Sequence, residues 1–563
     1  MSKQKMNDKT RIEHGEKKIE NNIISRAELL FYMSNLRPAA SIRYEGPTSY
    51  YYPSNGLSDA TISVESDSGV DSCDLLVQAD PDEKSLKKAY SELQPGAYLY
   101  TECTAAIHSK TAQFINTLYS IGFEEVNIYI PKPEPSHSVP RIFIPLGVPG
   151  AIEFLINARY QTYTTNIFKM LAYSFRKLLW RLTPKLFLTY PWLVSLSLNK
   201  FSLCSIARKP LNKQSNNTTL ASSNHKNETR TNLVDMLKNG WKNWGLGEQP
   251  DKLSALVLCR GIPTYDQIML FVFIGSDLKP TFVIKLPLKK LSTYYNSNEE
   301  KVLKILNKQY KRIEGIPDAI FSVKSLEAQI VCQTYISGIP LNNIINRKNY
   351  HELALLTTYW LTDFAIETRC ESTKDWRDIF IKQVISELDL CIGSILKPDT
   401  IETTNKILNE FELPFLVCEH RDFAPVNIIL SPKGKLGVVD WEDSRLCGLP
   451  ALDLIFFLTN TCIDYKLESD TKCNEQSYRN LIDPNTFTGA IFTDCINLYT
   501  SELGIPKTVI PCLRLMTWIV QAHISFLDVA TGTLKPQETL SEETHLAISL
   551  WEEEVLINNE YTE

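Results

Sequence analysis

A short stretch near residue 420 contains the residue types that phosphoryl transfer requires. Residues 420–427 read "HRDFAPVN", which places Asp422 five positions before Asn427. Phosphoryl transfer needs a carboxylate near the acceptor hydroxyl, oxygen ligands for a divalent cation, and a positive charge beside the phosphates. Asp422 suits the first role, and the neutral oxygen of Asn427 suits Mg²⁺, which prefers hard oxygen ligands. The stretch therefore predicts a phosphoryl-transfer loop.

Two more residues complete this predicted set. Asp440 ends the apolar segment "LGVVD" thirteen residues beyond Asn427, where it is a candidate for the second, charged metal ligand. Lys285 lies in the apolar strand "FVIKLPL" and is the candidate phosphate cation. A lysine in such a strand needs an acidic partner, which the helix containing Glu299 supplies. Each residue alone has an ordinary structural explanation, such as a turn or a solvated strand lysine, but the set in this order favours catalysis.

The same residues carry a family resemblance. Residues from about 250 to 530 resemble the aminoglycoside phosphotransferase and choline kinase family through "CEHRDFAPVNIIL" and "VVDWEDSRLCGLPALDLIFFL". His420, Asp422 and Asn427 match the family's H-x-D-x-x-x-x-N pattern, and its Asp-Trp-Glu begins at Asp440. The resemblance implies a bilobal protein-kinase-like fold, Asp422 as the catalytic base, and Asn427 and Asp440 as ligands of Mg²⁺.

The resemblance also implies that ATP or GTP binds in the cleft, with residues 333–336 as the hinge beside the purine. The nucleotide-binding prediction comprises Lys285, Glu299, Gly261, Gln333 and Tyr335, with His420, Arg421 and Glu442 in supporting roles. Glu299 is preferred as the partner of Lys285 because it fits the family's E-x-x-x-L pattern with Leu303. The phosphate loop "CRGIPTYDQ" offers only one glycine, so a pseudokinase without turnover is the alternative.

The segment after Asp440 argues against a protein kinase. Protein kinases carry Asp-Phe-Gly and then an activation segment that ends in Ala-Pro-Glu. Here Asp440 runs directly into "WEDSRLCGLPALDL", which leaves no room for a peptide-docking segment. The predicted acceptor is therefore a small hydroxylated molecule such as a sugar, amino sugar or polyol, and by family analogy the pathway concerns carbohydrates or envelope polymers.

Composition places these motifs in a multidomain chain. The 563 residues are 44% apolar and 22% charged with a net charge of −6, which favours soluble domains and argues against general nucleic-acid binding. Without a signal peptide, the 13 cysteines indicate reduced thiols in a cytoplasmic protein. The expected parts are a disordered tail (1–22), an α/β domain (23–212), a Ser/Asn/Thr-rich linker (213–232), a β-rich kinase-like lobe (233–340) and a helical lobe (341–563).

The N-terminal domain resembles part of a class I SAM-dependent methyltransferase. The resemblance covers about residues 70–210 and rests on "LQPGAYLYTE" and "LYSIGFEEVNIYIPKP". Residues 23–72 contain no G-x-G turn of the kind that lets backbone approach a nucleotide-like ligand. We therefore expect a truncated, partly Rossmann-like module that does not use SAM. One alternative is an unrelated α/β domain. The other is an active methyltransferase, which the missing turn disfavours.

One segment of this domain is strongly basic. Residues 154–213 contain ten Lys or Arg and no Asp or Glu, and the period of residues 167–182 predicts an amphipathic helix. Such a helix suits an anionic membrane surface, which would make the protein peripheral at the membrane. Packing on the domain's own sheet explains the pattern equally well, so both explanations stay open.

Overall fold

The computed structural model describes most of the chain, with gaps. The described residues are 23–35, 39–45, 61–64, 73–103, 111–132, 142–146, 148, 150–151, 154, 203–211, 233–260, 267–288, 290–310, 312–325, 328–371, 376–409, 411–413, 415–465, 467, 474–530 and 542–560. The predicted tail and linker, most of the basic segment, and Gly261 lie outside these residues.

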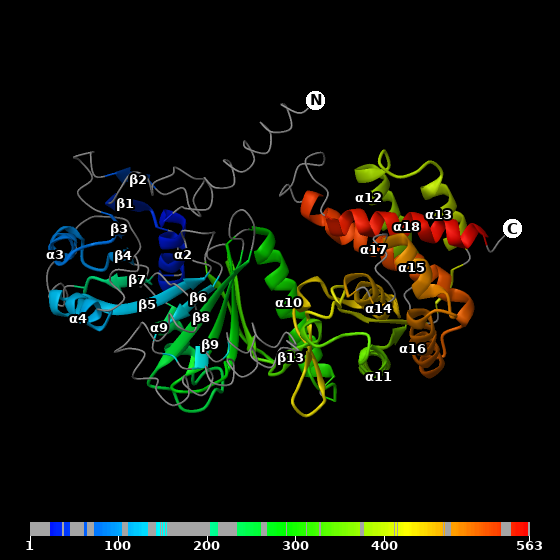
Figure 1. The fold of residues 1–563 in the computed structure, drawn as a ribbon, viewed down its shortest axis with the longest axis horizontal. Coiled ribbons are helices and arrows are strands. Elements are labelled where there is room, and N and C mark those ends of the chain that lie inside the picture. Colours follow the sequence, from blue (N-terminus) through cyan, green and yellow to red (C-terminus); the bar gives the residue numbers. More distant parts are fainter. Residues whose placement is uncertain are drawn as a thin grey trace. The chain divides into compact units, whose positions relative to one another are not determined.

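The chain divides into two compact units, which are described separately. The first comprises residues 1–160, 164–289 and 323–335, and the second comprises residues 161–163, 290–322 and 336–563. Figure 1 labels their helices and strands.

The described part of the first unit is built on one twelve-stranded sheet. Its order is β11 (Ala319–Ser325), β12 (Ala328–Thr334), β10 (Phe282–Pro287), β9 (Gln267–Ile274), β8 (Leu253–Arg260), β6 (Ile142–Pro145), β5 (Glu124–Lys132), β7 (Leu203–Arg208), β4 (Tyr98–Cys103), β3 (Leu75–Ala79), β1 (Ser41–Glu45) and β2 (Thr61–Val64). Strand β11 begins in the second unit.

The N-terminal end of this sheet has the alternating α/β order that the sequence predicts. Strands β2, β1, β3 and β4 are parallel, and β7 pairs antiparallel with both β4 and β5. Helix α3 (Glu83–Glu92) begins where Asp82 accepts the Ser85 backbone N–H at 2.7 Å. Gly96, in the predicted turn before β4, has φ 83°, which a residue with a side chain rarely adopts. The strands are confirmed, but the methyltransferase-like identity of the module stays a prediction.

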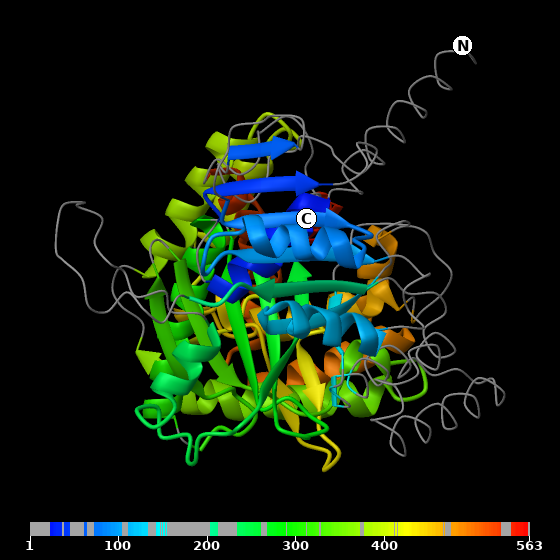
Figure 2. The same cartoon turned by 90° about the vertical axis from the view of Figure 1, so that its left-hand side faces the viewer.

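Helices cover both faces of this end of the sheet. Helix α3 and helix α4 (Thr111–Ile121) lie on one face, and helix α2 (Ile23–Asn35) lies on the other (Figures 1 and 2). Leu86 of α3 and Leu118 of α4 share a buried cluster with Leu76 and Leu99 of the sheet. Because side chains alternate along a strand, residues next to Leu76 and Leu99 face α2, where Phe31 packs edge-on against Tyr98 at 5.5 Å between ring centroids.

The remaining strands form an antiparallel group that joins the N-terminal strands edge to edge. Strand β6 pairs with β8 through Ile142 opposite Leu258 and Phe143 opposite Val257. Leu256 and Phe273 share one buried cluster with apolar residues of β4 to β7. Strands from both sides of the predicted linker therefore belong to one sheet. The predicted domain boundaries stay a prediction, and along β6 and β8 the two predicted domains are hydrogen-bonded to each other.

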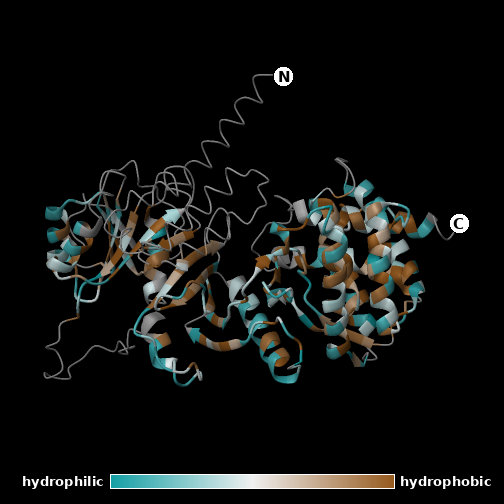
Figure 3. Cartoon of the chain, turned by 60° about the horizontal axis from the view of Figure 1, so that its bottom comes forward, coloured by the Kyte–Doolittle hydropathy of each residue, from teal (hydrophilic) through white to brown (hydrophobic). Residues whose placement is uncertain are grey.

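The second unit is mostly helical. Its helices are α10 (Lys290–Gln309), α11 (Tyr350–Thr368), α12 (Gln383–Ile392), α13 (Thr400–Leu408), α14 (Leu452–Asp464), α15 (Asn474–Ile482), α16 (Phe487–Leu503), α17 (Ile510–Ala530) and α18 (Glu542–Glu560). Apolar residues gather on the sides where these helices pack together (Figure 3). No helix among the described residues has the length and hydropathy to cross a bilayer.

Two small sheets in the second unit carry the predicted phosphoryl-transfer segment. One contains β13 (Ile339–Pro340), β16 (Ile428–Leu430) and β17 (Leu436–Val438). The other contains β14 (Cys370–Glu371), β15 (Phe415–Glu419) and β18 (Arg445–Gly448). "HRDFAPVN" therefore connects the last residue of β15 to the first residue of β16.

Candidate active site

The loop after β15 is held by an aspartate from another element. All five residues of β15 are buried, so the strand fixes where the chain leaves the core. Asp453, in the first turn of α14, accepts the backbone N–H groups of His420 at 2.7 Å and of Arg421 at 2.8 Å. Burial raises the pKa of Asp453 to about 6, although these two hydrogen bonds favour the carboxylate. One buried carboxyl group thus fixes the entry to the loop.

The peptide that precedes Asp422 has a sparsely populated conformation. Arg421 has φ 70°, a left-handed conformation that costs a non-glycine residue about 1 kcal/mol or more. Its carbonyl oxygen accepts a hydrogen bond from Gln521 Nε2 of α17 at 2.7 Å. Asp453 and Gln521 therefore hold the two sides of one strained residue, as is usual where a structure positions a functional group.

His420 packs inside the loop. Its Nε2 lies 3.0 Å from the Val439 carbonyl oxygen, and its ring lies edge-on to Trp441 at 4.7 Å between centroids. His420 is 1% exposed, so it is a structural residue of the loop and is not available to an acceptor. Its supporting role stays a prediction.

Asp422 and Asn427 are in direct contact. Asn427 Nδ2 donates to Asp422 Oδ2 at 2.7 Å and to the Asp422 carbonyl at 3.0 Å. The predicted pair is thus brought together by the turn between them, which the Asn427 N–H closes by donating to Ala424 at 2.9 Å. The bond fixes the orientation of the Asp422 carboxylate.

The hairpin of β16 and β17 returns the chain to this loop. The Val439 N–H donates to the Asn427 carbonyl at 3.0 Å, so the residue that follows, Asp440, begins its turn next to the loop. Asp440 has φ 70° and precedes the short 3-10 turn Trp441–Asp443. The thirteen residues from Asn427 to Asp440 therefore correspond to one short hairpin.

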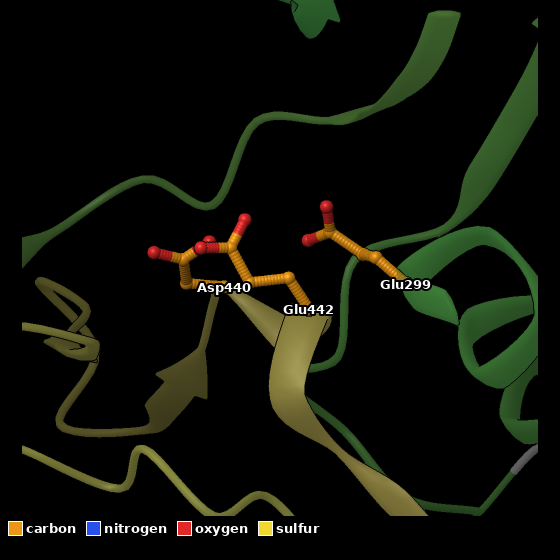
Figure 4. Close-up of side chains that lie close together, drawn as sticks. All are labelled: Glu299, Asp440 and Glu442. Carbon is orange, nitrogen blue, oxygen red and sulfur yellow. The ribbon is translucent and has the colours of Figure 1, made fainter. Parts of the chain in front are cut away.

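Three carboxylates meet at this turn (Figure 4). Oxygens of Glu299, Asp440 and Glu442 all lie within 4.8 Å of one another. Glu299 comes from α10, and its Oε1 also accepts the Trp441 backbone N–H at 3.2 Å. The structure therefore places Glu299 beside the predicted metal ligand Asp440, while Asn427 contacts Asp422.

Helix α10 contacts this turn through a second residue that the sequence analysis missed. Asn298 Nδ2 donates to the carbonyl oxygens of Glu442 and Ser444, both at 2.9 Å. The residues lie 144 and 146 positions apart, so no local pattern announces these bonds. The only available signal was that Asn298 immediately precedes Glu299.

The neighbouring carboxylates make Asp422 harder to ionise. The pKa of Asp422 is raised well above its ordinary value, chiefly by burial and then by the charges of Asp440, Asp443 and Glu442. A bound divalent cation would reverse this effect, because a nearby positive charge favours the ionised form. Oxygen ligands of this kind fit Mg²⁺.

Three other predicted nucleotide residues, Lys285, Gln333 and Tyr335, lie in the sheet of the first unit or directly after one of its strands. Lys285 is 1% exposed in β10, between Val331 of β12 and Met269 of β9. Gln333 lies opposite Val283 in the same pairing. Tyr335 directly follows β12, and its N–H donates to the Thr281 carbonyl at 3.0 Å. Burial raises the pKa of Tyr335 to about 12. Their roles stay predictions.

Comparison with known proteins identifies the class of this site. Residues 356–470 match the model of the phosphotransferase enzyme family, APH, which confirms the predicted resemblance over that segment. The matched segment contains Asp422, Asn427, Asp440 and Glu442, and it supports a phosphotransferase enzyme. The match does not extend to the N-terminal module. No match to a curated protein was found.

The chain is also similar to solved aminoglycoside phosphotransferases. An APH(2″) enzyme in complex with GDP and kanamycin is 12% identical, with a TM-score of 0.35 over 57% of this chain and 99% of that one. A thermostable APH(4)-Ia is 13% identical, with a TM-score of 0.34 over 56% and 97%. Spectinomycin phosphotransferase APH(9)-Ia with ADP and spectinomycin is 12% identical, with a TM-score of 0.32 over 58% and 96%.

Proposed function

We propose that this chain transfers the terminal phosphate of ATP or GTP to a hydroxyl group of a small molecule. The observation that carries the proposal is the hydrogen-bonded pair Asp422 and Asn427. Their loop lies next to the Asp440 turn. Both lie inside the segment that matches the phosphotransferase family. Solved structures of similar enzymes contain GDP or ADP, which supports nucleotide use.

Asp422 is the proposed base for the acceptor hydroxyl. Its carboxylate is half-buried and oriented by Asn427, so one oxygen can receive the acceptor proton while the other accepts the amide hydrogen bond. Such positioning, with charge neutralisation, is most of what a phosphotransferase must supply.

Mg²⁺ is the proposed cofactor. Asp440 would hold it with Glu442, and Glu299 or Asn427 would supply a further oxygen. When bound, the cation supplies positive charge to the nucleotide phosphates. Lys285, Gly261, Gln333 and Tyr335 remain the proposed contacts to the nucleotide.

The proposed acceptor is a sugar, amino sugar or polyol. After the Asp440 turn, β18 is only four residues long and α14 begins at Leu452, so no peptide-docking segment intervenes. This supports a small-molecule acceptor over a protein substrate. Assignment to a carbohydrate or envelope-polymer pathway rests on family analogy alone.

An acceptor screen with labelled ATP and GTP tests the proposal. The full chain is compared with Asp422→Asn across sugars, amino sugars and polyols. Transfer by the native chain that the variant loses is the expected result. Nucleotide binding with no transfer to any acceptor would instead favour the pseudokinase.

The N-terminal module is proposed to be a scaffold that does not use SAM. In support, the carboxylate of Glu102 at the end of β4 is held by Arg26 of α2 through two hydrogen bonds of 2.5 and 2.9 Å. In α/β sheets, ligands usually bind at the carboxyl ends of the parallel strands. This ion pair therefore lies where a ligand would otherwise bind.

The basic segment gives the module a proposed membrane contact. Its predicted helix lies outside the described residues, so the test is biochemical. The protein should sediment with vesicles of anionic lipid, and salt should release it, because each cation near the surface contributes about 1 kcal/mol. Replacing Arg176, Lys177 and Arg181 by Gln should abolish binding. Absence of sedimentation, with loss of stability in the triple variant, would favour internal packing.

A further inference from the structure

Two arginines, one in the catalytic loop and one on the strand beside it, have donors that no described residue accepts. The Arg421 side chain is 14% exposed, and its Nε lies 3.9 Å from Glu419 Oε2, beyond hydrogen-bond distance. Its guanidinium makes no hydrogen bond to any described residue, and its Nε is a buried atom without a partner there. Leaving a buried donor unpaired is costly, so an anion that accepts from this group would be favoured.

Arg445 lies on the neighbouring strand. Arg445 of β18 lies opposite Glu419 of β15 in the pairing of these two strands. Its guanidinium lies 4.1 Å from the centre of the Phe380 ring. Among the described residues it has no hydrogen bond or ion pair. Burial, and then the charge of Arg421, lower the pKa of Arg445, as expected when two guanidinium groups lie near each other.

Two buried carboxylates, Glu419 and Asp453, interact with the Arg421 charge, but both are hydrogen-bonded to backbone N–H groups and not to the guanidinium. Glu419 is buried and accepts the Leu449 N–H at 2.5 Å. Burial raises the pKa of Glu419 to about 7, so near neutral pH it carries only part of a negative charge. Asp453 also lies in the field of Arg421, and its two oxygens accept the backbone N–H groups of His420 and Arg421.

We propose that Arg421 and Arg445 form an oxyanion-binding site, which takes a phosphate or carboxylate group beside the catalytic loop. Guanidinium groups offer planar pairs of N–H donors that match such anions in charge and geometry. Resting on the proposed function, we assign this anion to the acceptor, which is then a phosphorylated or carboxylated hydroxy compound. A polycationic acceptor would instead meet two like charges.

Binding of inorganic phosphate to the nucleotide-free full chain tests the site. Calorimetry at constant ionic strength, maintained with KCl, compares the native chain with Arg445→Met and Arg369→Met. Arg369 is the matched control, because its guanidinium also stacks on a ring, 3.8 Å from the centre of Phe415 at the opposite end of β15. Losing charge-assisted hydrogen bonds should raise the dissociation constant about 10- to 100-fold in Arg445→Met only.

Absence of phosphate binding to the native chain, or equal binding by Arg445→Met, overturns the site. If Arg445→Met does not fold by circular dichroism, Arg445→Lys replaces it. Lysine keeps the positive charge but lacks the planar pair of N–H donors, so weaker phosphate binding is again expected. Unchanged phosphate binding refutes the proposal.

A second arm decides the source of the anion. Neutral sugars are compared with their monophosphates and uronic acids as acceptors of labelled phosphate. A higher kcat/KM for the anionic member, lost in Arg445→Met, supports the acceptor assignment. Transfer without that preference refutes it. Failure of all transfer with phosphate binding intact refutes the proposed function and not the anion site.

Discussion

Replacing Asp453 by asparagine should separate the stability of this protein from its activity. Burial raises the pKa of Asp453 from 3.8 to about 6. When folding raises the pKa of an acid, the protonated acid stabilises the fold at pH values below the pKa of the unfolded state. That contribution is lost as the pH rises through the pKa of the folded state. A shift of about 2 units corresponds to about 3 kcal/mol, lost between roughly pH 4 and pH 6.

Asparagine resembles the protonated acid, so Asp453→Asn lacks this pH-dependent loss. Above about pH 7 we expect the variant to be as stable as the native chain, or more stable by up to about 3 kcal/mol. Its single acceptor oxygen leaves one N–H of His420 or Arg421 unpaired, which weakens the hold on the loop. Turnover should fall about 10- to 100-fold, because small displacements of a catalytic group are costly.

Denaturant unfolding at a series of pH values, together with labelled phosphate transfer, checks both expectations. Asp494→Asn is the matched control, because the Asp494 side chain is 60% exposed. A variant several kcal/mol less stable than the native chain at pH 8 would show that the buried carboxylate stabilises the fold. Unchanged turnover would show that Asp453 does not position the loop.

The remaining predictions concern the loop, its metal ligand and the N-terminal module. Asp422→Asn should retain nucleotide binding and lose turnover, whereas Asp440→Ala should weaken Mg²⁺-dependent nucleotide binding; titration calorimetry and transfer assays distinguish them, and full turnover in Asp422→Asn would disprove the assigned base. Gln521→Met should lower kcat with little change in nucleotide affinity, because its amide holds the Arg421 carbonyl; an equal loss in both would indicate a general folding defect. A fragment from Asn232 should still gain thermal stability with ATP and Mg²⁺, but it should be less stable than the full chain because it uncovers the β8 edge. Calorimetry should detect no SAM binding, and micromolar affinity would contradict the scaffold proposal.

The sequence by itself determined the local parts of the site. Asp422, Asn427 and Asp440 lie within a loop and one hairpin, so their spacing along the chain fixes their spacing in the fold. The alternating strands and helices of the N-terminal module were predictable for the same reason, because burial on a sheet face depends on residue period. The motifs were also enough to predict the phosphotransferase resemblance that the family model confirms over residues 356–470.

Only the tertiary structure decided which distant residues support that loop. Gln521 reaches Arg421 across 100 positions, and Asn298 reaches the Asp440 turn across more than 140. Such contacts depend on how the helices pack, and the packing cannot be predicted from the spacing of residues along the chain. The composition of residues 213–232 predicts a linker, but it does not reveal that β6 and β8 on either side pair. Strand pairing is a match of backbone hydrogen bonds and buried faces, and these exist only when the fold brings two edges together.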